Sequence, residues 1–281
     1  MLIVADRPGL KRALAAREEV ALVPTMGNLH DGHLKLVELA RGRSACVVVS
    51  IFVNPLQFGP SEDLATYPRT LAEDCAKLER AGASVVFAPS ETVLYPRPQR
   101  VFVEPPPIAG DLCGAFRPGH FRGVATVVLK LFHLVGPRFA VFGKKDYQQL
   151  FIIRAMAEQL DVPVEIVAGE TLRAADGLAL SSRNGYLGPV ERAQAPRLYQ
   201  VLRECAQALT AGTRCADVEQ AGRARLESHG WRVDYVAVRS QATLSPPVRG
   251  DTALVVLGAA WLGRTRLIDN VEVLIGEDSG L

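Results

Sequence analysis

Two histidines three residues apart stand where an apolar strand pattern gives way to a helical one. The stretch is PTMGNLHDGHLKLVELA, residues 24–40, in which Gly27 and Gly32 accompany His30 and His33. A helix that begins near Gly32 has first amides without intrahelical partners, which attract an anion, and glycine lets the backbone approach a phosphate. Two imidazoles on that turn could donate hydrogen bonds to charge that develops on a phosphoryl group. The alternatives are a simple turn whose histidines face solvent or cap the helix, and a zinc site, for which no third ligand is visible.

A second stretch, SIFVNPLQF, ends the next apolar run with two side-chain amides, Asn54 and Gln57. An amide both donates and accepts hydrogen bonds, so this pair is suited to a hydroxyl or a carboxylate oxygen of a ligand. The alternative is an Asn-Pro turn that terminates the strand. The residues alone leave both interpretations open.

Charged and hydroxyl side chains follow two later apolar runs. In VFGKKDYQQL, Lys145 could pair with a phosphate, Asp146 could cap a helix or accept a ribose hydroxyl, and Gln149 lies one turn further on. In LALSSRNGYL, two serines and an arginine form a compact set for binding phosphate. Capped helices and serine-rich turns are the ordinary alternatives. All four stretches are nevertheless expected on one edge of a sheet, which favours a shared binding site.

Strand and helix patterns alternate along the first 170 residues. Continuous β-branched runs such as ACVVVSIFV are typical of strands that are covered on both faces. The alternation predicts the α/β class, with a Rossmann-like, doubly wound parallel sheet and right-handed crossovers. Strands are expected over residues 19–25, 45–53, 84–87, 138–142 and 164–168, and helices from about residue 32 and over 69–81, 121–135 and 146–160.

The pattern changes after Tyr186, where we expect a smaller α+β unit with antiparallel strands. The predicted domains are a Rossmann-like nucleotide- and substrate-binding domain over residues 1–172 and the smaller domain over 173–281. A Pro/Gly-rich segment, residues 95–120, is expected to be a working loop. In the smaller domain, helical patterns span 190–210 and 216–229, and strand-like runs span 232–239, 253–260 and 265–274.

Composition narrows the classes of protein that fit. The net charge of +2 in 281 residues and the lack of a basic run argue against nucleic acid as a partner. Asp6, Pro8 and Gly9 interrupt the first apolar stretch, so no signal peptide is expected, and no run approaches the ~20 apolar residues of a membrane span. Five scattered cysteines without a C-x-x-C pair predict reduced thiols and a cytoplasmic location.

Five longer motifs are spread along the chain and carry a resemblance that covers nearly all of it: VPTMGNLHDGHLKLV, SIFVNPLQFGPSEDLATYPRT, RPGHFRGVATVVLKLF, FGKKDYQQL and LSSRNGYL. In this order and spacing they resemble the pantothenate synthetase (pantoate–β-alanine ligase) family, within the HxGH nucleotidyltransferase superfamily. The resemblance implies that pantoate, bound in the first domain, attacks the α-phosphorus of ATP to give pantoyl adenylate and pyrophosphate. The amine of β-alanine then displaces AMP and forms pantothenate. The resemblance also implies Mg2+ with the nucleotide, and a homodimer.

The same resemblance implies a role for each motif-matched residue. His33 is the expected catalytic residue, His30 supports the phosphates beside it, and Lys145 neutralises charge on the triphosphate. Gln57 and Gln149 are expected to hold pantoate, with Gln57 also near β-alanine. The implied ATP-binding positions are Met26, Gly27, Asn28, Leu29, His30, Asp31, Gly32, His33, Gly143, Lys144, Lys145, Asp146, Leu172, Leu180, Ser181, Ser182 and Arg183.

Two positions depart from the family pattern. Leu180 stands where methionine is usual, which conserves apolar volume, and Lys144 stands where glutamate or glutamine is typical, which adds positive charge. The magnesium ligands stay unassigned, with Asp74 and the phosphates themselves as candidates.

Three other classes of protein are alternatives. An adenylyltransferase that forms no amide would share the histidine turn but would not need NPLQF or KDYQQ. A fragment of a class I aminoacyl-tRNA synthetase is disfavoured by the near-neutral charge and the lack of a basic anticodon-binding module. A non-catalytic nucleotide-binding protein is disfavoured because every expected polar group is present.

Overall fold

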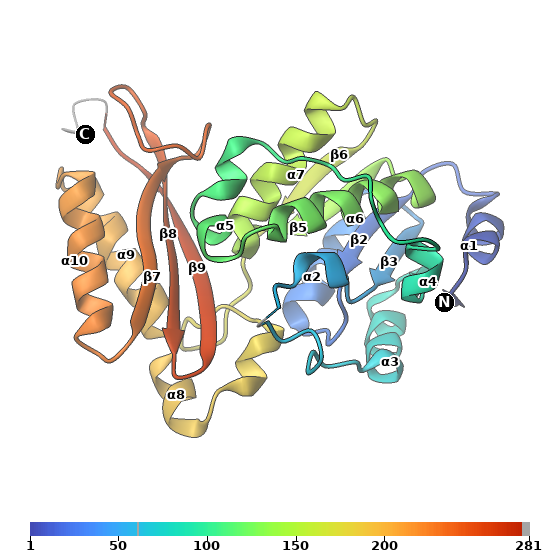
Figure 1. Ribbon diagram of the computed structural model, residues 1–281, viewed down its shortest axis with the longest axis horizontal. Helices are drawn as coiled ribbons and strands as arrows, with labels where there is room; N and C mark the ends of the chain where they lie inside the picture. Colours follow the sequence, from blue (N-terminus) through green and yellow to red (C-terminus); the bar gives the residue numbers. More distant parts are fainter. Residues whose placement is uncertain (61, 277–281) are drawn as a thin grey trace. The chain divides into compact units, whose positions relative to one another are not determined.

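The computed structural model describes residues 1–60 and 62–276, which form two compact units (Figure 1). The first unit consists of Met1–Lys144 and Gln149–Glu170, and the second of Lys145–Gln148 and the chain from Thr171 onward. Each unit has a hydrophobic core of its own. No helix in the described part of the chain combines the length and the apolar character that a bilayer span requires.

A parallel sheet of six strands forms the centre of the first unit. The strands are β1 (Leu2–Val4), β2 (Ala21–Thr25), β3 (Val47–Ile51), β4 (Val85–Phe87), β5 (Phe139–Gly143) and β6 (Glu165–Gly169). Their order is β1-β4-β3-β2-β5-β6, and every neighbouring pair is parallel. This confirms the predicted doubly wound α/β fold. The order of the strands reverses between β2 and β5, the switch point beside which such sheets bind ligands.

Helices cover both faces of this sheet (Figure 1). They are α1 (Arg7–Leu14), α2 (Asp31–Arg41), α3 (Leu71–Ala81), α4 (Glu91–Leu94), α5 (Cys113–Phe116), α6 (His120–Val135) and α7 (Tyr147–Gln159). Short 3-10 turns are η1 (Pro55–Gln57), η2 (Pro107–Gly110) and η3 (Lys144–Asp146). Apolar residues of α1, α6 and α7 join the core on one face, and those of α2 and α3 join the core on the other.

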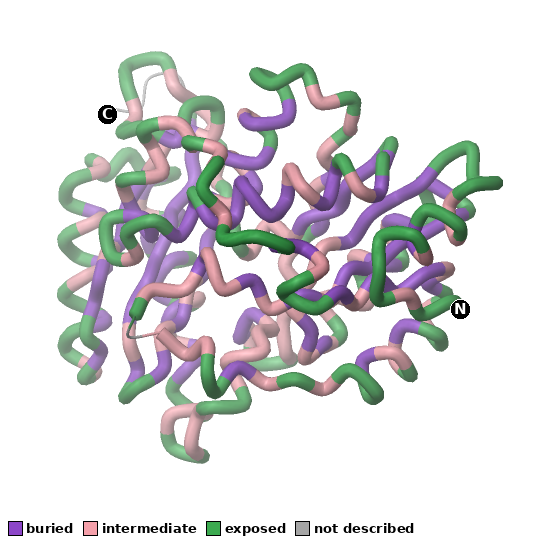
Figure 2. The backbone as a smooth tube through the Cα atoms, turned by 45° about the vertical axis from the view of Figure 1, so that its right-hand side comes forward, coloured by how far each residue is buried: buried purple, intermediate pink, exposed green. Residues whose placement is uncertain are grey.

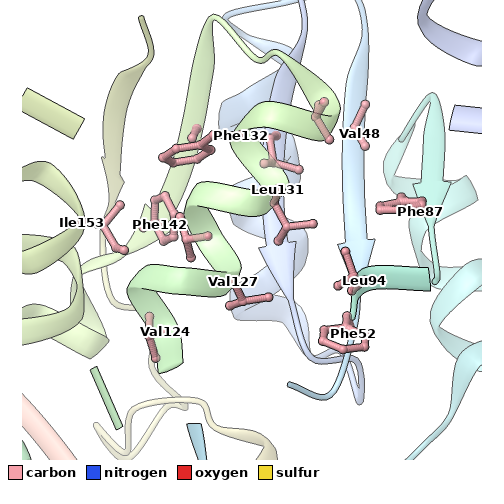
Figure 3. Packing of buried hydrophobic residues seen from close by; sticks show 14 of the residues in the cluster. Val48, Phe52, Phe87, Leu94, Val124, Val127, Leu131, Phe132, Phe142 and Ile153 are labelled. Carbon is pink, nitrogen blue, oxygen red and sulfur yellow. The ribbon is translucent and has the colours of Figure 1, made fainter. Parts of the chain in front are cut away.

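Neighbouring residues of each strand pack on opposite faces, because side chains alternate along a strand. Val48 of β3 and Phe87 of β4 lie in the same core as Phe132 of α6 (Figure 3). Val49 and Val86, one position away in the same strands, belong to the core on the other face. Both faces are therefore dry, which explains why these strands are apolar at every position except Ser50.

An antiparallel sheet of three strands forms the centre of the second unit, as predicted. Its elements are η4 (Ser182–Tyr186), α8 (Pro189–Gln194), α9 (Arg197–Thr210), α10 (Cys215–Glu227), β7 (Arg232–Ser240), β8 (Ala253–Leu262) and β9 (Thr265–Leu274). The middle strand, β8, is buried along most of its length (Figure 2). Leu202 of α9 and Val218 of α10 lie in one core with Val236 and Val256 of the sheet.

The amino-terminal residues form β1 and α1, which the apolar pattern did not predict. Asp6 caps α1 by accepting the N–H of Gly9 at 2.6 Å. Pro8 lies in the first turn, where its missing N–H has no intrahelical partner to lose. These residues therefore follow the apolar stretch of β1 and begin a helix that the sequence pattern did not predict.

Two predicted helices differ in their boundaries. The expected helix over 190–210 is divided, because Pro196 between α8 and α9 has no N–H to continue the helical ladder. The expected helix over 146–160 begins as the 3-10 turn η3, of which Asp146 is the last residue, and α7 starts at Tyr147. Part of the expected loop over 95–120 is helical, in η2 and α5.

Candidate active site

Three of the four predicted motifs follow neighbouring strands of the parallel sheet. β2 leads into residues 26–33, β3 into residues 54–57, and β5, which ends at Gly143, into residues 144–146. Because β3, β2 and β5 are adjacent and parallel, all three motifs begin at the same edge. The fourth motif, residues 178–187, belongs to the second unit.

The side chains of His30 and His33 cap helix α2. Nδ1 of His30 accepts the N–H of Gly32 at 3.2 Å, and Nδ1 of His33 accepts the N–H of His30 at 3.3 Å. The centroids of the two rings lie 4.1 Å apart. The capping interpretation that the sequence left open is therefore correct.

The caps also fix which nitrogen of each ring carries a proton. A ring nitrogen that accepts a backbone N–H has no proton of its own, so the proton of a neutral imidazole lies on Nε2. Both half-buried rings thus carry an Nε2–H donor beside the amino terminus of α2, where the helix dipole favours an anion. Capping and phosphate binding are compatible, because they use different nitrogens.

Helix α3 holds the loop that leads to these histidines. Asp74 is completely buried and accepts the backbone N–H groups of Asn28 and Leu29 at 2.9 and 2.8 Å. Nζ of Lys77 donates to the carbonyl oxygen of Leu29 at 2.7 Å. Gly27 has a φ of +81°, and a Cβ there would lie 3.1 Å from Oδ2 of Asp74. The loop conformation therefore requires glycine at this position.

The structure gives Asp74 a different role from magnesium ligation. Its Oδ2 also accepts a hydrogen bond from Oγ1 of Thr70 at 3.1 Å, so both carboxylate oxygens already have protein donors. Within residues 1–60 and 62–276, no group of three or more His, Cys, Asp or Glu side chains could hold a metal ion. Asp74 anchors the histidine loop.

The turn after β3 places two buried amides together. Asn54 accepts the N–H of Leu56 at 3.4 Å, and its Nδ2 donates to Oε1 of Gln57 at 3.1 Å. Nε2 of Gln57 lies 3.2 Å from Sδ of Met26. The structure thereby brings an expected pantoate residue beside the first expected ATP residue. The other expected pantoate residue, Gln149, is half-buried in the first turn of α7.

The backbone of Gln57 is held by a histidine to which the motifs gave no role. Nδ1 of His120 lies 2.8 Å from the carbonyl oxygen of Gln57, and Nε2 lies 3.0 Å from Nη1 of Arg117. A guanidinium only donates, so Nε2 accepts and Nδ1 carries the proton. Arg117 is fixed in turn by Glu62, with Nε donating to Oε1 at 2.9 Å. The segment RPGH contained this signal, but a local pattern does not show which carbonyl the histidine meets.

The two lysines after β5 have different partners. Nζ of Lys144 forms an ion pair with Glu170 at 2.7 Å, so the positive charge that departs from the family pattern is offset by a carboxylate. Nζ of Lys145 lies 3.9 Å from Oδ2 of Asp146. Nδ2 of Asn270 donates to the carbonyl oxygen of Lys145 at 3.0 Å, which fixes the backbone from which this side chain extends.

The remaining predicted residues, Leu172 and residues 180–183, lie in a hairpin and a turn of the second unit. The N–H of Leu180 donates to the carbonyl oxygen of Leu172 at 3.0 Å, so these two residues are neighbours. Ser181 caps η4, which begins at Ser182, by accepting the N–H of Arg183 at 3.3 Å. The serine-rich turn expected as an alternative is therefore present, and it holds both serines and the arginine in one short segment.

Fold and site together define the class of protein. It is an α/β protein with a doubly wound parallel sheet and a helix-capping His-x-Gly-His turn after β2, the sequence pattern that pointed to the HxGH nucleotidyltransferases.

The family model described as pantoate-beta-alanine ligase matches residues 3–272. A pantothenate synthetase of Chromobacterium violaceum is 61% identical over 257 residues, which cover 91% of this chain and 93% of the relative. That of Methylobacillus flagellatus is 56% identical over 271 residues, which cover 96% and 98%. The chain therefore belongs to the pantoate–β-alanine ligase family.

Solved structures agree. A pantothenate synthetase from Thermus thermophilus superposes with a TM-score of 0.91 at 46% identity, covering 98% of this chain and 100% of the other. A pantoate-beta-alanine ligase from Francisella tularensis, complexed with beta-gamma ATP and beta-alanine, has a TM-score of 0.81 at 32% identity, with 96% and 97% covered. The chain is accordingly an ATP-dependent ligase that forms pantothenate from pantoate and β-alanine.

Proposed function

We propose that the ligation proceeds through pantoyl adenylate, with His33 as the catalytic residue. The observation that carries this proposal is the pair of capping imidazoles, each with Nδ1 engaged by the backbone and a proton on Nε2. Donors fixed in this way need no reorganisation when negative charge grows on the α-phosphate oxygens. The bond from a pantoate carboxylate oxygen to the α-phosphorus forms as the bond to pyrophosphate breaks.

ATP is bound in this proposal by the segments that the motifs identify. Backbone groups come from residues 26–33 and 143–146, which also supply the side chains of His30 and Lys145. The adenosine is contacted by Leu172 and Leu180. Ser181, Ser182 and Arg183 hold the phosphates by hydrogen bonds and charge. Phosphoryl and adenylyl transfer depend on positioning and electrostatic stabilisation, so no nucleophilic serine or cysteine is required.

Pantoate is held in this proposal by the neutral amides of Gln57 and Gln149. A lysine paired with the attacking carboxylate would lower its nucleophilicity, whereas an amide N–H orients it at a smaller cost. Oε1 of Gln57 already accepts from Asn54 and one Nε2–H points to Sδ of Met26, which leaves the second Nε2–H to donate to a carboxylate. Gln57 also contacts β-alanine, which enters after the adenylate has formed.

Magnesium, the oligomer and the cellular location complete the proposal. The imidazole, ammonium and guanidinium groups of the motifs bind phosphate, whereas magnesium prefers oxygen ligands. Phosphate oxygens of ATP would therefore coordinate the ion, which would shield their charge. The family resemblance supports a homodimer, for which light scattering should give twice the chain mass of 30.4 kDa. Five cysteines that are all free thiols support a cytoplasmic location.

Replacing His33 by asparagine and by glutamine tests its role separately from capping. Asparagine places an oxygen acceptor near the position of Nδ1 and keeps the cap, but it lacks the distal donor. Glutamine can place an amide N–H near the position of Nε2. We expect His33→Asn to slow pyrophosphate release from ATP and pantoate by at least ~100-fold, the scale for losing a transition-state donor, and His33→Gln to retain more activity.

The matched control is His133→Asn, an exposed histidine in the last turn of α6. It should leave the rate within about twofold of the parent rate, the scale of a neutral surface substitution. Thermal unfolding of each variant monitors the cap. Pyrophosphate release at the parental rate by a folded His33→Asn protein would reject the assignment.

A further inference from the structure

Tyr95 joins the hydrogen bonds around Gln57, although it lies outside every motif that predicted the site. It follows helix α4 and is 8% exposed. Its hydroxyl donates to Oδ1 of Asn54 at 2.8 Å, across 41 residues of sequence. Burial, followed by the charge of Glu91, raises the pKa of Tyr95, so the phenol keeps its proton and remains a donor over the physiological range.

The orientation of the Asn54 amide follows from its partners. Oδ1 accepts the backbone N–H of Leu56, and Nδ2 donates to the backbone carbonyl oxygen of Gly123 at 3.2 Å. In the reverse orientation, Oδ1 would face the carbonyl oxygen of Gly123, and Nδ2 would face the N–H of Leu56. The hydrogen bond from the N–H of Leu56 is long, at 3.4 Å, so the 2.8 Å hydrogen bond from Tyr95 is the stronger of the two that Oδ1 accepts.

The orientation of Asn54 determines that of Gln57. Because Nδ2 of Asn54 donates to Oε1 of Gln57, the amide nitrogen of Gln57 is the atom that faces Met26. Hydrogen bonds in such a chain polarise one another, so a donor at Oδ1 strengthens the donation from Nδ2. The order Tyr95, Asn54, Gln57 therefore runs in one direction, with each group donating to the next.

We propose that Tyr95 is a positioning residue for pantoate: its hydroxyl, acting through Asn54, holds the Gln57 side chain with its N–H donors toward the carboxylate of the substrate. The proposal rests on the proposed function, in which Gln57 binds pantoate. It concerns the acid substrate and not ATP, because the chain of hydrogen bonds ends on Gln57.

Tyr95→Phe removes the hydroxyl and leaves the ring in place. The ring lies 5.9 Å from that of Phe52 between centroids, and Nζ of Lys130 lies 4.9 Å from its centroid. Neither contact uses the hydroxyl. We expect the KM for pantoate in the first step to rise about five- to tenfold, the scale of one lost neutral hydrogen bond, with the KM for ATP within about twofold of the parent.

Two further variants make the result interpretable. Tyr235→Phe deletes a hydroxyl from β7 in the second unit and should change neither KM. Gln57→Ala should raise the KM for pantoate more than Tyr95→Phe does, and the double variant should resemble Gln57→Ala, because the hydroxyl acts only through that glutamine.

The outcomes separate the inference from the function on which it rests. If Gln57→Ala raises the KM for pantoate and a folded Tyr95→Phe does not, the role of Tyr95 is rejected and that of Gln57 stands. An equal rise in both KM values for Tyr95→Phe indicates a structural role alone and also rejects the inference. If Gln57→Ala leaves pantoate binding unchanged, the proposed role of Gln57 fails, and with it the inference.

Discussion

Asp74 is completely buried, and its carboxylate holds the loop before His30 by accepting two backbone N–H groups. A buried carboxylate is stable only when donors replace its lost hydration, and Asn28, Leu29 and Thr70 supply them. The conformation of the histidine turn therefore depends on a residue that need not touch the nucleotide.

Asp74→Asn should weaken ATP use and lower stability, because an NH2 group would replace one acceptor and face a backbone donor. We expect a loss of about 1–3 kcal/mol in the free energy of unfolding, and a larger rise in the KM for ATP than for pantoate. Denaturant unfolding and initial rates measure the two effects. Glu73→Gln, an exposed neighbour in the same turn of α3, is the control and should alter neither. A normal KM for ATP in Asp74→Asn would contradict the anchoring role.

Helix α6 and the turn η1 approach each other closely at Gly123. A Cβ on this glycine would lie 2.1 Å from the carbonyl oxygen of Leu56 and 2.7 Å from the backbone nitrogen of Gln57. Both atoms belong to the backbone, so no side-chain rotation relieves the contact. The absence of a side chain lets α6 supply the Gly123 carbonyl oxygen to Asn54 and the His120 ring to Gln57.

Gly123→Ala should therefore displace η1 from α6 and impair pantoate use. We expect a loss of roughly 1–3 kcal/mol in stability, typical of overpacking, with a rise in the KM for pantoate that exceeds any change for ATP. Gly110→Ala is the matched control, because its Cβ would meet no atom within 4 Å and its φ is not positive. Parental kinetics and stability for Gly123→Ala would show that the two elements can separate without consequence.

At the scale of the whole molecule, stability should depend on pH through a thiol in the core of the second unit. Burial raises the pKa of Cys205 to about 11 from its ordinary value of 9.0. The folded state then keeps a proton that the unfolded chain releases near pH 9. This contribution is fully present below pH 9 and is lost as pH rises toward 11, because only the unfolded state ionises in that window.

Cys205→Ala should remove this pH dependence. The variant loses stability at pH 7 because a cavity remains between α9 and α10. Between pH 9 and 11 it should decline less than the parent, by on the order of 2 kcal/mol, with urea midpoints as the measurement. Other groups that titrate in this range contribute equally to both proteins. Parallel declines in the two proteins would refute the role of this thiol.

Most of the parallel sheet could be predicted because its signals are local. Apolar runs predicted β2 to β6 within a few residues, and the alternation with helices predicted the doubly wound order. Strand β1, an edge strand of three exposed or half-buried residues, was missed, and α1 was missed because its capping Asp and Pro resemble an interruption. These misses lie at the edge of the sheet, away from the histidine turn.

The sequence by itself determined the family, the chemistry and the identity of the motif residues, because each motif is a continuous segment of the chain. Only the tertiary structure decided what holds those residues in place. Asp74 meets Asn28 across 46 residues, Tyr95 meets Asn54 across 41, and His120 meets Gln57 across 63. No local periodicity encodes such pairings, since they arise only when strand order brings distant turns to one edge of the sheet and helices close over them.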